Sequence, residues 1–450
     1  MRRFILAFAA AIAVIGCAPK EDAVLVFEVE NPTAREIMMV CHNTLMPVSL
    51  NAEGHAQIVM EGLDAAYAKM FYGREFKWIY FERGDRSVIR FDGHDFSDSF
   101  IFEGEKSEAV AYLNRVKFTA LPDEDYALPF DEYYVKVLAK ENDAVKLMKA
   151  NGLKSAGHFE DMEEGRIRYA YAATLLMHPV GHMMMARNMA YIPDESYYDV
   201  IESYFVEDKN WIDVDEYRDF MLEAAHMLDA ENRNVKTLYP KTVAQLKFIA
   251  DRIADEKVRN TLLHQLAATY VERHGTDDIQ DLENIYLTYV KDPVLLADYK
   301  AKCDKWDFAK PGKPSPKLEA VDVDGRVWTL DDFIGKYVYM DMWATWCAPC
   351  RREMPYLKAL EEKFHGTDIV FVGLSTDKDK GKWEEMVRNG SLSGLQLHLG
   401  PQSAFQKAYN VEGIPHFILL DKEGKIISNN MSKPSAPETE SVLESLINNR

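Results

Sequence analysis

Cysteine is scarce in this sequence, with five residues among 450. Small scaffolds that disulfide bonds hold together carry a far higher proportion of cysteine, so the sequence excludes that class of protein. A chain of this length is too long for one ordinary core, and its apolar and charged fractions are those of soluble globular proteins. The composition therefore predicts two or three folded domains.

Positive charge is also in short supply. Lys and Arg together number 53 against 73 Asp and Glu, which gives a formal net charge of −20. The phosphates of a nucleic acid would be repelled by such a charge, so the composition argues against a nucleic-acid partner.

The N-terminal apolar run, Phe4 to Ile15, is too short to span a bilayer comfortably, and it follows the positively charged stretch Met1–Arg3. It ends on Val14–Cys17, a tetrad that resembles the lipobox of bacterial lipoproteins. The resemblance implies a signal peptide over residues 1–16 and lipidation of Cys17, whose acyl chains would tether the mature protein to a membrane. An ordinary secretory signal with a chance cysteine is the alternative.

The residues after Cys17 bear on the location. Ala18 stands where aspartate would signal inner-membrane retention in enterobacteria, which favours the outer membrane, facing the periplasm. The stretch Lys20–Asp22 resembles the short surface-export tag of Bacteroidetes lipoproteins, although a solvated tether explains these residues equally well. The prediction is a lipid-anchored protein of the cell envelope, with exposure at the cell surface left open.

Two of the cysteines, Cys347 and Cys350, form a Cys-x-x-Cys pair after an apolar, β-favouring run from Tyr337 to Trp343. The pair stands where a helix is expected to begin, and the free N–H groups and dipole there stabilise a thiolate and lower its pKa. Cys347, at the exposed edge, is the predicted attacking thiolate, and Cys350, one turn further in, is the predicted resolving thiol. A structural disulfide and half of a zinc site are the alternatives, but no second Cys/His pair stands nearby.

The motif W-C-A-P-C-R-x-E-x-P, Trp346 to Pro355, resembles the TlpA/ResA-like branch of the thioredoxin superfamily, which consists of extracytoplasmic thiol-disulfide oxidoreductases. The resemblance implies a thioredoxin-like α/β domain over residues 317–450. Its redox group would be the Cys347–Cys350 pair itself, with no added cofactor and no metal. Ala348 replaces the acidic residue that this branch often has between the cysteines. Any tuning of the cysteine pair that depends on that acid is therefore not expected in this chain.

Asp341 lies six positions before Cys347 on the predicted central strand and matches the buried acid of thioredoxin. A carboxyl that burial desolvates has a raised pKa and would take the proton from Cys350 as it attacks. Many TlpA-like relatives carry a neutral residue here, and a partly solvated acid without a role is the alternative.

The stretch Gly413–His416 resembles the loop whose cis-proline faces the cysteine pair. The resemblance implies a cis Ile414–Pro415 bond, with the Ile414 backbone pairing with substrate in β fashion. It also implies that Trp346 covers Cys347. The predicted substrate-binding residues are Trp346, Ile414 and Pro415.

The rest of the chain divides by its periodicity. Residues 17–106 hold short alternating runs between turn residues, which predicts a small β-sandwich. Residues 107–306 change to helical spacing and predict an all-α domain, and residues 307–316 form a Pro-rich linker. This layout resembles Bacteroidetes lipoproteins with an N-terminal β domain and a TlpA-like module. Helices are expected at 108–116, 132–150, 165–177, 196–205, 215–230, 243–253, 256–270 and 278–290, with Pro193, Pro240 and Pro293 between them.

The helical part contains His178 and His182, four residues apart and followed by Met183–Met185, a combination that would suit copper. Pro179 and Gly181 disfavour a regular helix between the histidines, and no carboxylate or cysteine completes the set, so core packing is the preferred interpretation.

The remaining cysteines, Cys41 and Cys303, are expected to be unpaired, although a bond between them stays open.

The sequence thus predicts a thiol-disulfide oxidoreductase that reduces disulfides in substrate proteins and is recharged by a membrane electron donor. The same motif serves oxidases and isomerases, because direction depends on potential and partner. A hairpin expected at 318–330 suggests a thiol peroxidase as one alternative. This alternative is weakened because the chain has W-C-A-P-C where a peroxidase would have the peroxidatic pattern T-x-x-C. The other alternative is a surface or periplasmic binding lipoprotein with an accessory redox domain.

Overall fold

The structure is a computed structural model and describes residues 21–42, 44–153, 158–235, 237–307, 310–390, 392–411 and 413–448. The chain divides into two compact units: Met1–Arg233 with Ile253–Val258, and Asn234–Arg252 with Arg259–Arg450. The division falls inside the predicted helical domain, and the predicted domain limits stay predictions. The predicted signal peptide and Cys17 lie outside the described residues.

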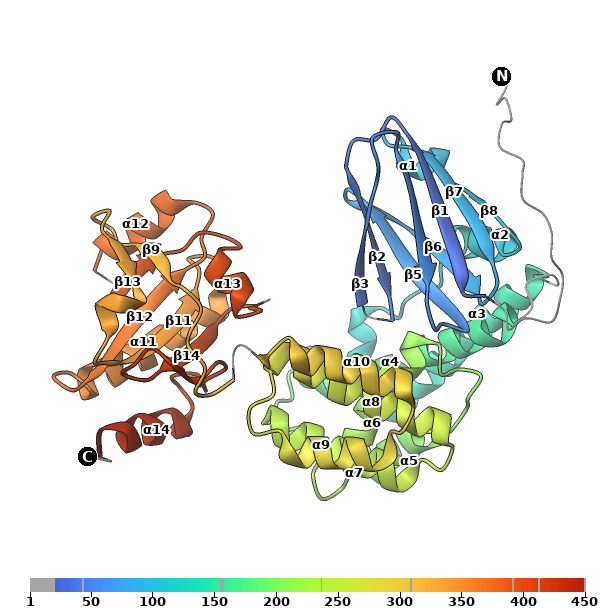
Figure 1. Cartoon of the computed structure of the whole chain (residues 1–450). Helices are drawn as coiled ribbons and strands as arrows, with labels where there is room; N and C mark the ends of the chain where they lie inside the picture. Colours follow the sequence, from blue (N-terminus) through green and yellow to red (C-terminus); the bar gives the residue numbers. More distant parts are fainter. Residues whose placement is uncertain are drawn as a thin grey trace. The chain divides into compact units, whose positions relative to one another are not determined.

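The first unit begins with two four-stranded sheets, drawn in blue in Figure 1. One has the order β4 (His55–Met60), β1 (Ala23–Glu30), β7 (Arg86–Asp92), β8 (Ile101–Glu103); the other has β3 (Thr44–Ser49), β2 (Glu36–Cys41), β5 (Ala65–Tyr72), β6 (Glu75–Glu82). Every second residue of β1 is buried, because one face of the strand packs on the core. Tyr72 of one sheet lies edge-on to Phe91 of the other, with ring centroids 5.0 Å apart, as expected for the predicted sandwich.

The long helix α4 (Phe159–Met185) contains a buried ion pair that contacts this sandwich. Glu163 is fully buried and accepts hydrogen bonds of 2.7 Å from Arg166 and 3.1 Å from the hydroxyl of Tyr67 on β5. The Arg166 guanidinium also lies 5.7 Å from the ring centroid of Trp78. Buried charges need such partners, so this cluster fixes the helix to the sheet.

The helical part confirms the change of periodicity near residue 107 (green to yellow in Figure 1). Its helices are α2 (Ser107–Arg115), α3 (Phe130–Ala150), α4, α5 (Glu195–Tyr204), α6 (Asp215–Leu228), α7 (Leu238–Arg252), α8 (Glu256–His274), α9 (Gln280–Tyr289) and α10 (Pro293–Asp304). The short helix α1 (Phe96–Ser99) comes earlier, between β7 and β8. Helix α10 is absent from the prediction, which treats Pro293 as a break between helices. Proline suits the first helical position, and the Asp292 carboxylate caps the helix by accepting from the N–H of Val294 at 2.7 Å.

The expectation that Pro179 and Gly181 interrupt the helix is wrong, since α4 continues through both to Met185. Tertiary contacts offset the local cost. A Cβ on Gly181 would lie 2.5 Å from the Tyr126 ring, so only glycine admits that ring. His182 Nδ1 lies 3.0 Å from the Tyr126 carbonyl oxygen, and His178 Nε2 bonds another carbonyl of the same turn at 3.1 Å.

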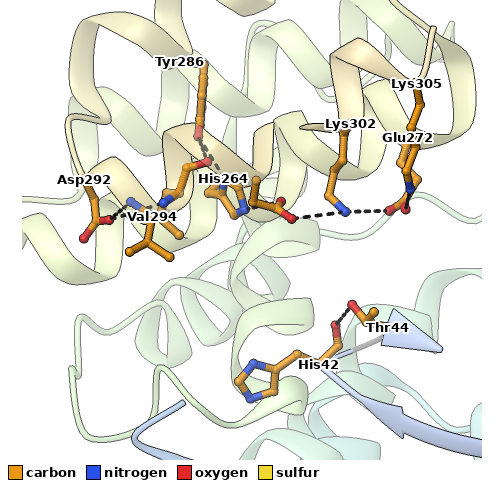
Figure 2. A network of polar contacts seen from close by, with 11 residues as sticks. His42, Thr44, His264, Glu272, Tyr286, Asp292, Val294, Lys302 and Lys305 are labelled. Carbon is orange, nitrogen blue, oxygen red and sulfur yellow. Dashed lines mark hydrogen bonds and ion pairs between the residues drawn. The ribbon is translucent and has the colours of Figure 1, made fainter. Parts of the chain in front are cut away.

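Polar side chains join α8, α9 and α10 in the second unit. Figure 2 shows His264 of α8 beside Tyr286 of α9, with 2.9 Å between Nδ1 and the hydroxyl oxygen. The other ring nitrogen of His264 lies 3.1 Å from a carboxylate oxygen of Asp298 on α10, and this contact contributes most to the lowered pKa of Asp298. The ammonium of Lys302 on α10 donates to the carboxylate of Glu272 on α8 at 3.2 Å (Figure 2). These polar contacts therefore connect all three helices.

The C-terminal part is a thioredoxin-like α/β fold. Its seven-stranded sheet has the order β10 (Val327–Thr329), β9 (Glu319–Val321), β13 (Leu395–His398), β12 (Ile369–Ser375), β11 (Tyr337–Trp343), β14 (His416–Leu420), β15 (Ile426–Ser428). Its helices are α11 (Ala348–Lys363), α12 (Lys380–Arg388), α13 (Ala404–Ala408) and α14 (Pro437–Asn448). Strand β11 lies parallel to β12 and antiparallel to β14, so it occupies the interior of the sheet, and only Tyr337 of its residues is not buried.

Within the described residues, no helix has both the length and the apolar character needed to cross a membrane.

Candidate active site

The two cysteines of the motif lie where β11 ends and α11 begins. Cys347 is the N-cap residue of α11, and Cys350 lies in the first turn. The structure contains the disulfide between them. The backbone N–H of Cys350 donates to the sulfur of Cys347 at 3.2 Å, which is the contact that would stabilise a thiolate at this position.

The prediction that Cys347 lies at an exposed edge is wrong for the disulfide form. Cys347 is only 3% exposed and Cys350 1%, and both belong to one buried cluster with Trp343, Ala344 and Trp383. The side chain of Trp346, expected to cover Cys347, is instead 70% exposed. It therefore stands as an apolar surface beside the pair rather than as its lid.

The loop before β14 faces the cysteine pair. Its Ile414–Pro415 peptide bond is cis, as the resemblance implied. The carbonyl oxygen of Ile414 lies 3.8 Å from the sulfur of Cys347. That sulfur carries no proton in the disulfide, so the contact is van der Waals in this form and becomes a possible hydrogen bond only in the thiol form.

Asp341 lies in the middle of β11 and is 3% exposed. Burial and the negative charge of Glu353 together raise the pKa of Asp341 to about 7. Its Oδ1 atom has no hydrogen-bond partner among the described residues. Asp341 lines a small cavity together with Met354 and Leu357. These two residues follow Cys350 by one and two helical turns, so the cavity lies along the helix face that carries Cys350.

Glu353 belongs to the motif that carried the resemblance, but the motif alone predicts no role for it. It is buried on α11 and accepts hydrogen bonds from the backbone N–H of Ser435 at 2.9 Å and from its hydroxyl at 3.0 Å. The ammonium of Lys433 lies 3.9 Å away. The negative charge of Glu353 opposes ionisation of Asp341 and so helps to raise the pKa of Asp341.

Asp377 is a second residue of the site that no pattern in the sequence predicts. It follows β12, is buried, and accepts hydrogen bonds from the backbone N–H of Thr345 at 2.9 Å and from the Thr345 hydroxyl at 2.7 Å. The hydroxyl of Ser375 donates a further bond at 2.9 Å. Asp377 thereby holds the turn that leads into Cys347.

The other candidate residues do not join this site. Cys41 and Cys303 are both free, and burial raises the pKa of the Cys41 thiol to about 12 and that of Cys303 above its usual value. His178 and His182 bond backbone carbonyls instead of facing an open site. Among the described residues, no group of three or more His, Cys, Asp and Glu side chains is arranged to hold a metal ion.

Comparisons with known proteins agree on the C-terminal part. A family model described as Redoxin matches residues 310–447. The thiol-disulfide oxidoreductase ResA of Geobacillus thermodenitrificans is 31% identical over 125 residues, which span 27% of this chain and 71% of that protein. ResA of Bacillus cereus is 28% identical over 152 residues, or 34% of this chain and 86% of that protein. The solution structure of a putative thiol-disulfide oxidoreductase from Bacteroides vulgatus is 52% identical and covers 30% of this chain and 90% of that one, with a TM-score of 0.28.

The fold, the cysteine pair and these relatives define an enzyme of the thiol-disulfide oxidoreductase class. The chain belongs to the TlpA/ResA-like proteins of the thioredoxin family.

Proposed function

We propose that this enzyme reduces protein disulfides outside the cytoplasm, with Cys347 as the attacking thiolate and Cys350 as the resolving thiol. The observation that carries the proposal is the N-cap position of Cys347, where the N–H of Cys350 points at its sulfur. A thiolate there would be stabilised by that N–H and by the helix dipole. The relatives named thiol-disulfide oxidoreductase ResA support the reaction class.

In the proposed reaction the Cys347 thiolate attacks one sulfur of a substrate disulfide, and the other substrate sulfur leaves as a thiolate. Cys350 then loses its proton and attacks the sulfur of Cys347, and the second substrate thiolate leaves. Two electrons have then passed to the substrate, and the enzyme holds the Cys347–Cys350 disulfide seen in the structure. A membrane electron donor with a dithiol would reduce that disulfide and complete the cycle.

Asp341 would receive the proton of Cys350. A carboxyl with a pKa of about 7 is partly ionised near neutral pH, so it can accept a proton and release it again. The raised pKa, the unpartnered oxygen and the cavity along the Cys350 face of α11 support this role.

The substrate would lie against Trp346, Ile414 and Pro415. An exposed tryptophan offers apolar contact area, and the carbonyl of Ile414 lies within 3.8 Å of the attacking sulfur. A substrate segment that pairs with the Ile414 backbone in β fashion would therefore bring its disulfide to Cys347.

The proposal includes a lipid anchor on Cys17 after removal of residues 1–16, with the protein attached to the outer membrane and facing the periplasm. The sequence supports this through the lipobox-like tetrad and through Ala18 after the cysteine. Along the chain, residues 17–106 and 107–306 would come between the lipid anchor and the redox domain, with residues 307–316 as the linker.

The test combines the reduction potential of the Cys347–Cys350 pair with reduction of insulin disulfides. We expect a potential well below that of the glutathione pool and loss of insulin reduction in Cys347→Ala. Cys303→Ala, which removes a free thiol that is half-buried, is the matched control and should keep full activity. A strongly oxidising potential would contradict a reductase, and peroxide turnover without insulin reduction would favour a thiol peroxidase.

A further inference from the structure

The end of helix α8 and the tryptophan after α10 pack against the redox domain within the second unit. The side-chain amide of Asn430 donates to the carbonyl of His274 at 3.1 Å. Gly275 has a φ of +84°, and a Cβ on it would lie 3.4 Å from Asn429 Oδ1 and 3.4 Å from Trp306 Cε3. Asn429 and Trp306 are 0% and 1% exposed, so this contact, which we call the Trp306 joint, is closely packed.

Asn429 connects the Trp306 joint to the cis-proline loop. Its backbone N–H donates to the carboxylate of Asp277 in the loop after α8. Its carbonyl oxygen lies 2.7 Å from His416 Nε2, and a carbonyl can only accept, so Nε2 donates. Burial lowers the pKa of His416 to about 4, and the ring is therefore neutral with its proton on Nε2. His416 follows Pro415 directly in the chain.

A second backbone contact fixes the same region. The N–H of Met431 donates to the carbonyl of Phe417 at 2.8 Å, next to the bond between Asn429 and His416. The chain on both sides of Asn429 is therefore tied to the first residues of β14, and β14 carries the cis-proline loop at its start.

We propose that the helical segment positions the cis-proline loop for its substrate: Trp306, Gly275 and Asp277 fix Asn429, and Asn429 fixes His416 beside Pro415. This inference rests on the proposed reductase function, because only a substrate that binds the loop would sense its position. Trp306, Asp277 and Asn429 act through His416 and are positioning residues rather than catalytic ones.

Two kinds of substrate should respond differently to loss of the Trp306 joint. A protein disulfide would pair with the backbone of Ile414, so displacement of the loop should raise its KM. A small aromatic disulfide such as DTNB needs only the sulfur of Cys347, so its rate should stay unchanged. A change in KM without a change in the chemistry at Cys347 identifies lost binding geometry rather than lost reactivity.

The experiment compares Trp306→Ala and Asp277→Ala with the unaltered full chain, using insulin, DTNB and the reduction potential. Because a displacement of about 1 Å can cost up to 100-fold, we expect the KM for insulin to rise by roughly tenfold. The DTNB rate and the potential should stay within about twofold. Trp306→Phe, which keeps an aromatic ring in place, should retain most of the affinity for insulin.

Asp292→Ala is the matched control for helix stability, because it removes the N-cap at the other end of α10. It should leave the KM for insulin unchanged. If Trp306→Ala does not fold, Asp277→Asn and the surface variant Asn430→Ala replace it. Both should also raise the KM for insulin.

An unchanged KM for insulin in the variants that fold, or an equal loss of insulin and DTNB activity, would overturn the positioning role. If the unaltered protein reduces neither substrate, the proposed function fails instead, so the two failures are distinguishable.

Discussion

Replacing Asp341 with asparagine should stabilise the oxidised redox domain above neutral pH while slowing its reaction. The pKa of Asp341 is raised from its usual value of 3.8 to about 7, because the carboxyl is buried near the charge of Glu353. The folded chain thus holds this proton more tightly than the unfolded chain does. The resulting stabilisation is fully present below about pH 4 and is lost as the pH rises through about 7.

The size of the effect follows from the shift. About three pKa units at about 1.4 kcal/mol each correspond to roughly 4 kcal/mol of stability lost between pH 4 and pH 8. Asparagine cannot ionise, so Asp341→Asn should escape this loss. Without a proton acceptor for Cys350, the resolving step should slow by about 100-fold.

Hydrogen exchange of the β11 amides, compared between the two proteins at pH 4 and at pH 8, measures the stability effect. The variant should be protected about equally at pH 4 and more strongly at pH 8. Asp368→Asn is the matched control, because Lys422 and Lys336 lower the pKa of Asp368. Its effect should have the opposite sign, with weaker protection than the unaltered protein at pH 8. Equal protection of Asp341→Asn and the unaltered protein at pH 8 would refute the reasoning, and an unchanged resolving rate would refute the role of Asp341 in proton transfer.

Three further variants test the supporting contacts. Asp377→Ala removes two hydrogen bonds to Thr345 and should lower the free energy of unfolding by about 2 kcal/mol. It should also slow the reaction of the reduced enzyme with DTNB, and Asp377→Asn should give intermediate values of both. Glu163→Gln removes the nearer of two carboxylates that face Arg166 and leaves only Glu216, 3.8 Å away, so it should lower the urea stability of the first unit by about 3 kcal/mol. Gly181→Ala should lower the midpoint of thermal unfolding, because a Cβ 2.5 Å from the ring of Tyr126 costs about 1–3 kcal/mol. The higher helix propensity of alanine offsets only part of this cost.

The redox turn was predictable because its determinants are adjacent in the sequence. The apolar run of β11, the N-cap cysteine and the proline after it all act within one short stretch.

The remaining parts of the site depend on contacts between distant residues. Glu353 accepts hydrogen bonds from Ser435, which lies 82 positions further along the chain. Asp377 accepts hydrogen bonds from Thr345, 32 positions earlier. No periodicity or spacing marks such pairs, because they form only when the sheet brings β12 and the chain after β15 to the end of β11. The burial of Cys347 has the same origin, since Trp383 comes from α12.

Local propensity also failed where packing outweighed it. A proline inside a helix costs about 3 kcal/mol in isolation, which is why Pro179 was expected to interrupt α4. The close contact of Gly181 with Tyr126 and the two histidine bonds to backbone carbonyls hold the helix in place instead.

The most direct test of the central claim is to trap the mixed disulfide between Cys347 and its substrate. Cys350→Ala removes the resolving thiol, so substrate proteins should stay covalently attached to Cys347 until an added thiol releases them. The double variant with Cys347→Ala is the control and should trap nothing. Partners trapped only by Cys350→Ala are the predicted result. No trapped protein, or equal trapping by the double variant, would contradict the account.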